Sequence, residues 1–431
     1  MLHFNELWVL RSDCQRQVYE PSAAATFAQV KMKGLHYGQR KLHLSEMQLL
    51  NTVYKDIKPS KPILFVYAGA APGVHLPFLF ELYPSIKCVL IDPAPFCAEV
   101  KALAADGPIL ELINDICTDE LCLRLSRSYG SKHYMVFVSD IRTGNPSKMT
   151  KNIEHTKMME MDNELQKSWC LSIKADIAML KFHPPYPKET DPTSSRFDPE
   201  DDTPAQISYL AGVSLWGVWA PKSSSEVRLV VTGPFGGNMK IAEAVYDCKE
   251  HEEICHFYNI NNRYNQDCKV ERSILEDYIS LYPDKYASVV LLSNEMSKRL
   301  GFPLFQPLEK DFTEDHARFL SLIYSTRNPE AVLLFDMFKS VMSIDQVVAV
   351  VNQYKESEVV PQNVTVGGVK LSESFWKCFC KGDFADIYSL PKFRWRFFGN
   401  LFFQKVALRT IIMRREDDNV HLLLSVILFA Y

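Results

Sequence analysis

The feature of this chain that most constrains its fold is an apolar run that ends abruptly in small residues. Residues 62–68 read Pro-Ile-Leu-Phe-Val-Tyr-Ala, and residues 69–73 read Gly-Ala-Ala-Pro-Gly. A continuous apolar run of this length is typical of a strand buried on both faces, as in a parallel sheet. The small residues predict a tight loop, and residues 75–83 can form the next helix. This order predicts the first unit of a doubly wound α/β domain, whose ligands lie at the carboxyl ends of the strands.

A second buried strand indicates what kind of ligand to expect. Residues 86–91 are followed by Asp92, which lies 19 residues after Gly73. In nucleotide-binding α/β domains, an acid at the end of the second strand accepts hydrogen bonds from ribose hydroxyls. The loop lacks the dinucleotide fingerprint G-x-G-x-x-G, so an ordinary tight turn stays open as the alternative. Ala-Pro-Gly in place of a phosphate cradle favours an adenosine ligand without phosphates, and S-adenosylmethionine is the first candidate.

Composition limits the class of protein. The 431 residues are 47% apolar and 23% charged, as in a folded chain with two or three domains' worth of core. The net charge of -4 means that any contact with nucleic acid must come from a local patch. The 11 cysteines contain no C-x-x-C pair, which predicts reduced thiols. With no signal peptide and no bilayer-spanning apolar segment in the sequence, we expect a soluble intracellular protein.

Three ionisable side chains stand at the ends of predicted strands. These are Asp140 after residues 134–139, Lys181 after 176–180, and Glu226 before 227–232. Each fits a solvated rim residue, but their joint occurrence where ligands lie favours a site. Lys41 lies in the opening turn of a predicted helix, where the helix dipole does not favour a cation, so a solvated lysine is the simplest interpretation.

The remaining patterns concern helices and one insertion. Residues 150–176 fit an amphipathic helix, and the polar, proline-rich residues 188–205 are expected to form a mobile surface insertion. Residues 392–398 interleave cations with aromatics, as nucleic-acid surfaces do, although a packed element fits them better. From about residue 265 helical patterns dominate, at residues 273–281, 286–300, 314–325, 331–341 and 344–355.

Several motifs occur in an order that points to one family. They are Tyr19-Glu20-Pro21, residues 38–42, 67–73, 90–92, 139–142, 180–187 and 225–229. Together they resemble the cap-specific mRNA nucleoside 2′-O-methyltransferases of poxviruses, within the wider group of FtsJ-like RNA methyltransferases. The resemblance implies a Rossmann-like α/β sheet with helices on both faces. It also implies a cap-contacting segment at residues 1–36 and a methyltransferase domain at 37–265. Beyond them the resemblance fades, and the helical patterns predict a mainly helical region of unknown role at 266–431.

The resemblance places four residues on the family's Lys-Asp-Lys-Glu tetrad: Lys41, Asp140, Lys181 and Glu226. A ribose 2′-hydroxyl is a poor nucleophile until its proton is removed or its developing charge is met. We expect Lys181 to activate this hydroxyl and Asp140 to orient Lys181. Lys41 and Glu226 are expected to supply positioning and electrostatic support, and no metal is implied.

The resemblance also implies ligand contacts. Tyr19 and Tyr186 would stack on the cationic 7-methylguanine, and Glu252 would read its N–H edge. His183, Ser224 and Ser225 complete the expected contacts with cap and RNA. Two positions depart from the family, because Ala94 replaces an arginine that contacts the cofactor and Lys188 replaces an acid that reads the cap. The expected S-adenosylmethionine contacts are Gln39, Tyr67, Gly69, Ala71, Pro72, Gly73, Asp92, Ile116, Cys117 and Asp140.

The function implied is methylation of the 2′-hydroxyl of the first transcribed nucleotide of 7-methylguanosine-capped mRNA. One alternative is an FtsJ-like methyltransferase acting on uncapped structured RNA, and another is a non-catalytic RNA-binding or polymerase-accessory subunit. Expected partners are capped mRNA and other viral mRNA-processing or polyadenylation subunits, with no membrane. The expected location is the host cytoplasm or viral factory, with packaging in the virion. The divergent carboxyl-terminal region suggests another large cytoplasmic DNA virus, with an asfarvirus as the candidate.

Overall fold

The computed structural model describes most of the chain up to residue 300. The described residues are 2–18, 37–144, 152–193, 197–220, 224–233, 235, 242–300, 365–366 and 369–370. The chain divides into two units, the first holding residues 1–25, 36–259 and 266–308 and the second holding residues 26–35, 260–265 and 309–431. Within the second unit, β10 (Thr365–Val366) and β11 (Val369–Lys370) form an antiparallel pair. The helices predicted beyond residue 300 and the segment 392–398 lie outside the described residues, and the three-part domain division stays a prediction.

The first unit is built on one seven-stranded sheet with the order β3-β2-β1-β4-β5-β8-β7. The first five strands along the chain pair in parallel, whereas β8 pairs antiparallel with both β5 and β7. This confirms the predicted α/β class with a mostly parallel sheet. The strands are β1 (Ile63–Ala68), β2 (Lys87–Ile91), β3 (Ile109–Ile113), β4 (Tyr134–Ser139), β5 (Ile177–Phe182), β7 (Val213–Trp216) and β8 (Val227–Thr232).

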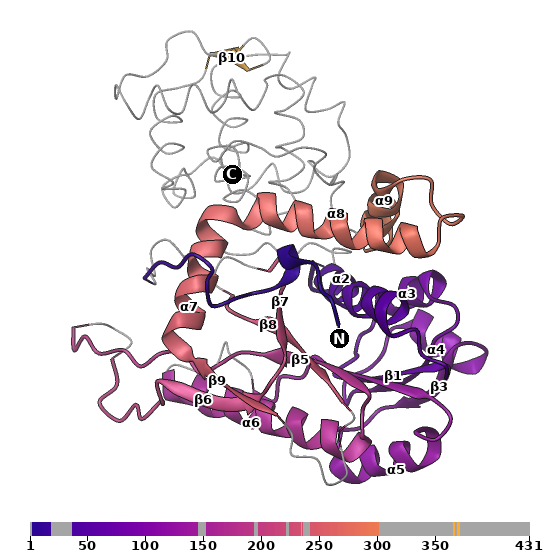
Figure 1. The fold of residues 1–431 in the computed structure, drawn as a ribbon, viewed down its shortest axis with the longest axis horizontal. Helices are drawn as coiled ribbons and strands as arrows, with labels where there is room; N and C mark the ends of the chain where they lie inside the picture. The colour runs from indigo at the N-terminus through magenta and orange to yellow at the C-terminus, as the bar shows by residue number, and fades with distance from the viewer. Residues whose placement is uncertain are drawn as a thin grey trace, which may run out of the picture. The chain divides into compact units, whose positions relative to one another are not determined.

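Helices cover both faces of this sheet, as predicted. Figure 1 shows α2 (Tyr37–Thr52) and α3 (Leu76–Leu82) on one side, with α5 (Asp119–Tyr129) and α6 (Asn152–Ile173) on the other. Alternate residues of β1 face α5 and α6, so Leu64 and Val66 share one buried cluster with Leu125 and Trp169. α4 (Ala98–Ala105) follows β2.

The carboxyl edge of the sheet contains a topological switch point. β1 lies between β2 and β4, so the chain leaves β1 and β4 toward opposite faces of the sheet. In open α/β sheets this is where ligands bind. Because β8 is antiparallel, it begins where β5 ends, with Val227 paired to Phe182. Glu226, which precedes β8, is therefore at the same edge as the ends of β4 and β5.

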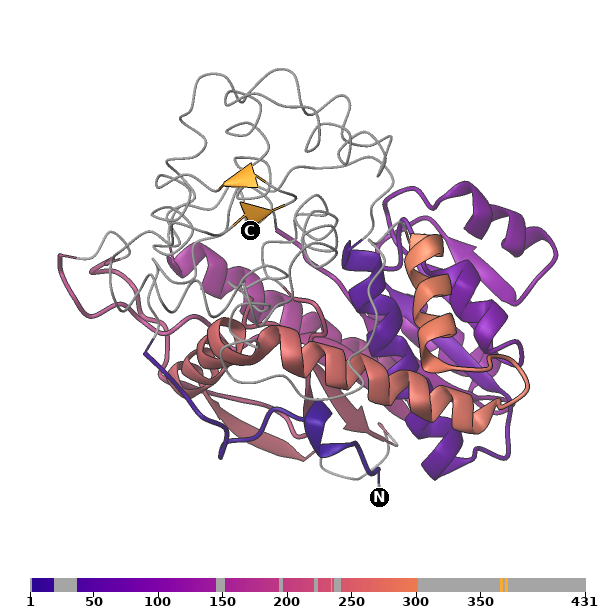
Figure 2. The ribbon, with the colours of Figure 1, turned by 90° about the horizontal axis from the view of Figure 1, so that it is seen from above.

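Further elements flank the sheet, and two of them, η4 (Tyr258–Asn262) and α8 (Arg263–Leu281), include residues of the second unit. β6 (Gln206–Leu210) and β9 (Glu243–Asp247) form a separate antiparallel pair that leads into α7 (Cys248–Phe257). The helices predicted at residues 273–281 and 286–300 correspond to α8 (Arg263–Leu281) and α9 (Val289–Leu300). Figure 2 shows the long α8 and the shorter α9 beside the helices of the amino-terminal half. Short helical turns occur at η1 (Glu6–Trp8), η2 (Val53–Ile57) and η4 (Tyr258–Asn262).

The predicted surface insertion at residues 188–205 is only partly exposed. Residues 191–193 are exposed, but Asp201 is 1% exposed and Thr203 is 8% exposed. The Thr203 backbone N–H donates to Asp201 Oδ1 (3.0 Å), and its hydroxyl lies 3.0 Å from the Thr156 hydroxyl of α6. These bonds satisfy polar groups locally, so Thr203 packs on α6, and for the buried Asp201 and Thr203 the prediction of a surface insertion is wrong, whereas Asp202 between them is exposed. Within the described ranges, we find no helix whose length and hydropathy suit a membrane crossing.

Candidate functional site

The four predicted tetrad residues meet at the carboxyl edge of the sheet. Lys41 Nζ lies 2.8 Å from Glu226 Oε1. Lys181 Nζ lies 3.2 Å from Asp140 Oδ1 and 3.5 Å from Glu226 Oε2. The exposed fractions of the four side chains lie between 13% and 18%. The structure therefore brings two lysines and two acids into one connected cluster that is largely screened from solvent.

Four different elements position these side chains. Lys41 lies near the start of α2, and Asp140 follows β4 directly. The Asp140 backbone N–H donates to the carbonyl of the last residue of β1 (3.0 Å), which holds it at the switch point. Lys181 is a residue of β5 whose backbone N–H donates to Gln166 Oε1 of α6 (3.1 Å), while Gln166 Nε2 donates back to the Lys181 carbonyl (2.9 Å). The backbone at Asp140 and at Lys181 is thus held by hydrogen bonds that do not involve their charged side chains.

Two arginines that the sequence reasoning did not assign also belong to this cluster. Arg228 of β8 is 2% exposed, with Nη1 2.8 Å from Asp140 Oδ1 and Nη2 3.3 Å from Glu226 Oε1. Arg142 bridges Glu226 Oε2 and Asp162 Oδ2, both at 3.2 Å. A signal was present, since each arginine lies two residues after a tetrad acid. Side chains two apart on a strand share a face, which could have placed Arg228 beside Glu226.

Burial and charge together set the protonation of the cluster. Burial lowers the pKa of Lys41 to about 8, although Glu226 and Asp140 act to raise it. Burial alone would raise the pKa of Glu226, but the surrounding cations, first Lys41, hold it well below its usual range. The pKa of Asp140 is likewise lowered, because Lys181 and Arg228 outweigh the effect of burial. Both acids are therefore ionised at neutral pH, and Lys41 titrates close to it.

The loop after β1 has the conformation expected of a ligand-binding turn. Gly69 (φ +82°) and Gly73 (φ +71°) both occupy the left-handed region that favours glycine, and Ala71 and Pro72 lie between them. A Cβ at position 69 would lie 2.9 Å from the backbone carbon of Asp140. The loop can therefore approach the end of β4 only because residue 69 has no side chain.

Asp92 joins this loop to the one that follows β2. Its Oδ2 accepts from the Ala71 N–H (2.9 Å), and its Oδ1 accepts from the Ala94 N–H (2.7 Å). Each oxygen keeps a further lone pair for a ribose diol. After β3, the side chain of Ile116 is 61% exposed and Cys117 is half-buried, which offers an apolar surface for a base. These residues fit an adenosine-type cofactor.

Two other predicted cofactor residues lie next to the loop. Gln39 Oε1 accepts from the His75 backbone N–H (3.4 Å) and lies 2.7 Å from His75 Nδ1. His75 Nε2 lies 2.8 Å from Glu46 Oε1, so Gln39 and Glu46 of α2 hold the residue that precedes α3. Tyr67 is fully buried in β1, with its ring centroid 6.4 Å from that of His75. The structure thus places Gln39 and Tyr67 around the segment that follows Gly73.

His183 and Ser225, both predicted to contact the cap or RNA, form a hydrogen bond with each other. His183 Nε2 lies 2.6 Å from the Ser225 hydroxyl, and His183 Nδ1 is bonded to the Pro184 carbonyl. A carbonyl only accepts, so Nδ1 carries the hydrogen and the Ser225 hydroxyl donates to Nε2. His251 Nε2 lies 2.7 Å from the Ser225 carbonyl, and the Tyr186 ring packs on His183 with centroids 4.6 Å apart. His183 and Ser225 thus link β5 to the residues before β8, and a direct contact with RNA stays a prediction for them.

The other predicted cap contacts are placed in part. Glu252 is a residue of α7 with 7% exposure, and Ser224 is half-buried. Gln17 of the amino-terminal segment donates its backbone N–H to the Glu253 carbonyl (3.2 Å), so that segment runs along α7. Tyr19 lies outside the described residues.

Comparison with known proteins gives two kinds of similarity. A family model described as "Poly A polymerase regulatory subunit" matches residues 2–300. The chain is 27% identical over 157 residues to the cap-specific mRNA (nucleoside-2'-O-)-methyltransferase of Fowlpox virus (strain NVSL), which is 35% of this chain and 48% of that protein. It is 26% identical over 181 residues to the protein of the same name from Myxoma virus (strain Lausanne), or 40% of this chain and 48% of that protein. The chain thus spans about half the length of the curated relatives it matches.

Proposed function

This chain belongs to the poly A polymerase regulatory subunit family, and from that premise we propose that it transfers a methyl group from S-adenosylmethionine to the ribose 2′-hydroxyl of the first nucleotide of capped mRNA. The relatives from two poxviruses carry the name of a cap-specific mRNA 2′-O-methyltransferase. The observation that carries the proposal is the convergence of Lys41, Asp140, Lys181 and Glu226 beside the glycine loop.

The proposed cofactor would be held by the loop of Gly69 and Gly73 and by the free lone pairs of Asp92. When bound, it supplies a methyl group already activated on a sulfonium. Lys181 is proposed to bind the 2′-hydroxyl and to stabilise negative charge on its oxygen while the oxygen–methyl bond forms, the sulfur–methyl bond breaks and the hydroxyl proton passes to solvent water. Asp140, 3.2 Å away, orients Lys181 for this task. Because no bond in the protein is made or broken, positioning of the acceptor contributes much of the rate.

The charge of the site suits an RNA substrate. Lys41, Arg142, Lys181 and Arg228 outnumber the carboxylates that they contact, which are Asp140, Asp162 and Glu226. The cluster is therefore locally positive although the chain carries a net charge of -4. A phosphate beside the acceptor ribose would meet this excess positive charge.

The family description favours a second candidate function. A regulatory subunit of a poly(A) polymerase can act by binding RNA without catalysis. In that case the cluster would serve RNA binding, and polyadenylation subunits would be the partners. Action on an uncapped structured RNA is a further alternative. A location in the host cytoplasm or virion and an asfarvirus source stay predictions.

Transfer of tritium from labelled S-adenosylmethionine to two matched short RNAs separates these functions. One RNA carries a 7-methylguanosine cap and the other ends in unmethylated guanosine. We expect label only on the methylated-cap RNA, lost in Lys181→Ala and retained in Lys249→Ala, whose side chain is 72% exposed. Equal label on both RNAs would remove cap selectivity from the proposal. Binding of cofactor and RNA with no transfer would favour the accessory subunit.

A further inference from the structure

Helix α8 carries two buried carboxylates that bind residues next to the Lys41–Glu226 ion pair. Asp267 and Glu271 lie one turn apart on α8, and both are 0% exposed. Glu271 Oε1 accepts from Arg40 Nη2 (2.6 Å) and from the Ser293 hydroxyl of α9 (2.8 Å). Glu271 Oε2 accepts from the indole N–H of Trp219 (2.7 Å). Asp267 Oδ2 accepts from the Trp219 backbone N–H (2.9 Å), so two acids of one helix hold a single tryptophan.

The tryptophan belongs to a short segment that borders the proposed catalytic cluster. Trp219 has φ +59°, a conformation that side-chain-bearing residues disfavour and that needs support from its surroundings. Two residues earlier, a Cβ at Gly217 would lie 3.5 Å from the Glu226 carbonyl oxygen and 3.8 Å from Lys41 Cδ. The segment 217–220 therefore forms a wall against which the Lys41–Glu226 pair packs.

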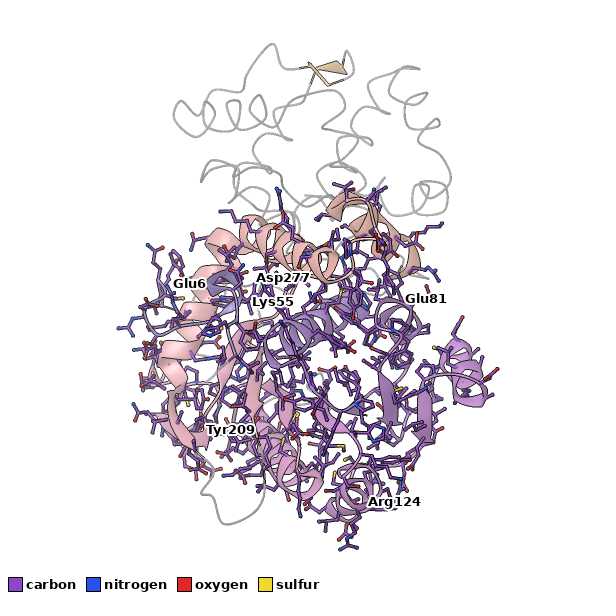
Figure 3. The ribbon with its side chains drawn as sticks, turned by 45° about the vertical axis from the view of Figure 1, so that its right-hand side comes forward. Glu6, Lys55, Glu81, Arg124, Tyr209 and Asp277 are labelled. Carbon is purple, nitrogen blue, oxygen red and sulfur yellow. The ribbon has the colours of Figure 1, made fainter. Side chains whose placement is uncertain are left out.

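The second link from α8 to the Lys41–Glu226 pair runs through Arg40, the neighbour of Lys41 on α2. Arg40 is 0% exposed and directly precedes Lys41 on α2, so its ion pair with Glu271 fixes the turn that carries Lys41. Away from the site, α8 is also joined to α2 through Asn51 and to the following turn η2 through Lys55. Asn51 Nδ2 donates to the Ile274 carbonyl (2.9 Å), and Lys55 Nζ lies 2.9 Å from Asp277 Oδ1, as Figure 3 shows for these labelled neighbours.

We propose that Asp267 and Glu271 of α8 are positioning residues for the Lys41–Glu226 ion pair, acting through Trp219 on one side and Arg40 on the other. A role in catalysis rests on the proposed function, whereas the effect on Lys41 does not. The charged groups that face Lys41 are Glu226 before β8, Arg228 of β8, Asp140 after β4 and Lys181 of β5. None of them lies on α8, so α8 can affect Lys41 only by moving its surroundings.

The choice of variant follows from the network. Glu271→Gln would remove the carboxylate that is paired with the buried Arg40 and can prevent folding. Trp219→Phe is milder, because it removes the indole donor to Glu271 Oε2 and part of the buried ring volume but keeps both charges of the Arg40–Glu271 pair. Ser293→Ala is the control for the tryptophan link, since it removes a donor to the same carboxylate and a 3.3 Å acceptor of Arg40 Nη2 but leaves Trp219 and the Arg40–Glu271 ion pair in place. Both variants are made in the full chain.

Trace acetylation with acetic anhydride, read by peptide mass spectrometry across pH, measures the titration of Lys41. Lys249, which is 72% exposed, serves as the internal reference. We expect Trp219→Phe to hydrate the pair and raise the Lys41 midpoint from about 8 by about one pH unit, which lowers its labelling at pH 8 about fivefold. Ser293→Ala should leave the midpoint unchanged even where it lowers the melting temperature by a similar amount.

Activity provides the second readout. Trp219→Phe is expected to lower kcat for methyl transfer about tenfold with little change in KM for the cofactor. An unchanged Lys41 midpoint in Trp219→Phe, or equal shifts in both variants, would overturn the positioning role. Labelling requires no substrate, so a shifted midpoint in a chain that transfers no methyl group would support this inference while removing the proposed function.

Discussion

At the scale of single residues, the site is a set of buried charges that depend on one another. Glu226 contacts four cations, and Arg228 contacts both Asp140 and Glu226. A charge taken out of water costs several kcal/mol unless a partner and good geometry compensate for it. Arg228 provides such geometry, because its planar guanidinium reaches two carboxylates at once.

Replacement of Arg228 by lysine tests this geometry. Arg228→Lys keeps the charge but cannot span Asp140 and Glu226 together, so we expect kcat to fall about tenfold or more and stability to fall by about 2 kcal/mol. Steady-state kinetics and thermal melting measure the two effects. The control is Arg124→Lys, labelled in Figure 3, because Arg124 makes a similar fork with Glu111 (3.0 and 2.6 Å) but is 48% exposed. Arg124→Lys should lower stability by under about 1 kcal/mol and leave kcat unchanged. Equal effects of the two substitutions would contradict the role given to Arg228.

At the scale of elements, the loop after β1 determines how closely the ends of β1 and β4 approach. Gly69 lets this loop pass against the Asp140 backbone, and Asp92 ties the same loop to the end of β2. The ends of three neighbouring strands are thus held together by one glycine and one carboxylate. Displacement of this loop would move Asp140 relative to Lys181, which lies on the next strand.

A pair of glycine substitutions separates this constraint from general glycine effects. Gly69→Ala places a methyl group 2.9 Å from the Asp140 backbone and forces alanine into a left-handed conformation, so we expect a loss of about 1–3 kcal/mol. Cofactor binding should weaken as well. Gly38→Ala meets no described atom within 4 Å outside its own helix, and in α2 it should stabilise by up to about 1 kcal/mol. Denaturant unfolding and titration calorimetry check both, and normal cofactor affinity in Gly69→Ala would argue against the loop as the cofactor site.

At the scale of the whole molecule, distant parts of the chain meet at Ser225. His183 after β5 bonds its hydroxyl, and His251 of α7 bonds its carbonyl. Burial lowers the pKa of His183 to about 3 and that of His251 to about 4, so both rings are neutral in the folded protein. In the unfolded chain, a histidine ring binds a proton with a pKa of about 6.5. The free energy of unfolding therefore depends on pH through these two rings.

The sign of this linkage follows from the lowered pKa values. Stability from the neutral rings is fully present above about pH 6.5 and is lost as pH falls toward 4 and 3, at about 1.4 kcal/mol per pH unit for each ring. His251→Gln keeps an N–H donor for Ser225 but does not titrate, so it should reduce the slope of unfolding free energy against pH by about one proton. Urea unfolding between pH 4 and 7 measures the slope, and an unchanged slope would show that His251 does not titrate as described.

Much of the fold follows from the sequence by itself. Apolar runs predicted β1, β2, β4, β5 and β8, because a strand buried on both faces excludes polar residues. The same runs placed Asp140 and Lys181 at the carboxyl edge, since the ends of parallel strands lie together. The glycine loop was predicted because only small residues allow its turns. Glu226 was placed at the carboxyl edge as well, by the strand that follows it, and the resemblance to known motifs added Lys41 to the candidate site.

Only the tertiary structure decided how the charges are paired. The sequence pattern favoured a solvated Lys41, yet the side chain is 14% exposed because β8, which runs antiparallel, brings Glu226 to it. The Arg40–Glu271 pair joins residues 231 positions apart, and the sequence pattern of α8 does not predict this pairing. The periodicity of apolar residues indicates which face of a helix or strand is buried. It does not indicate which other segment supplies the partner of a buried charge, because that depends on the contacts made in the fold. For this reason the sequence determined the sheet and the edge that carries the site, and the tertiary structure determined the ion pairs within it.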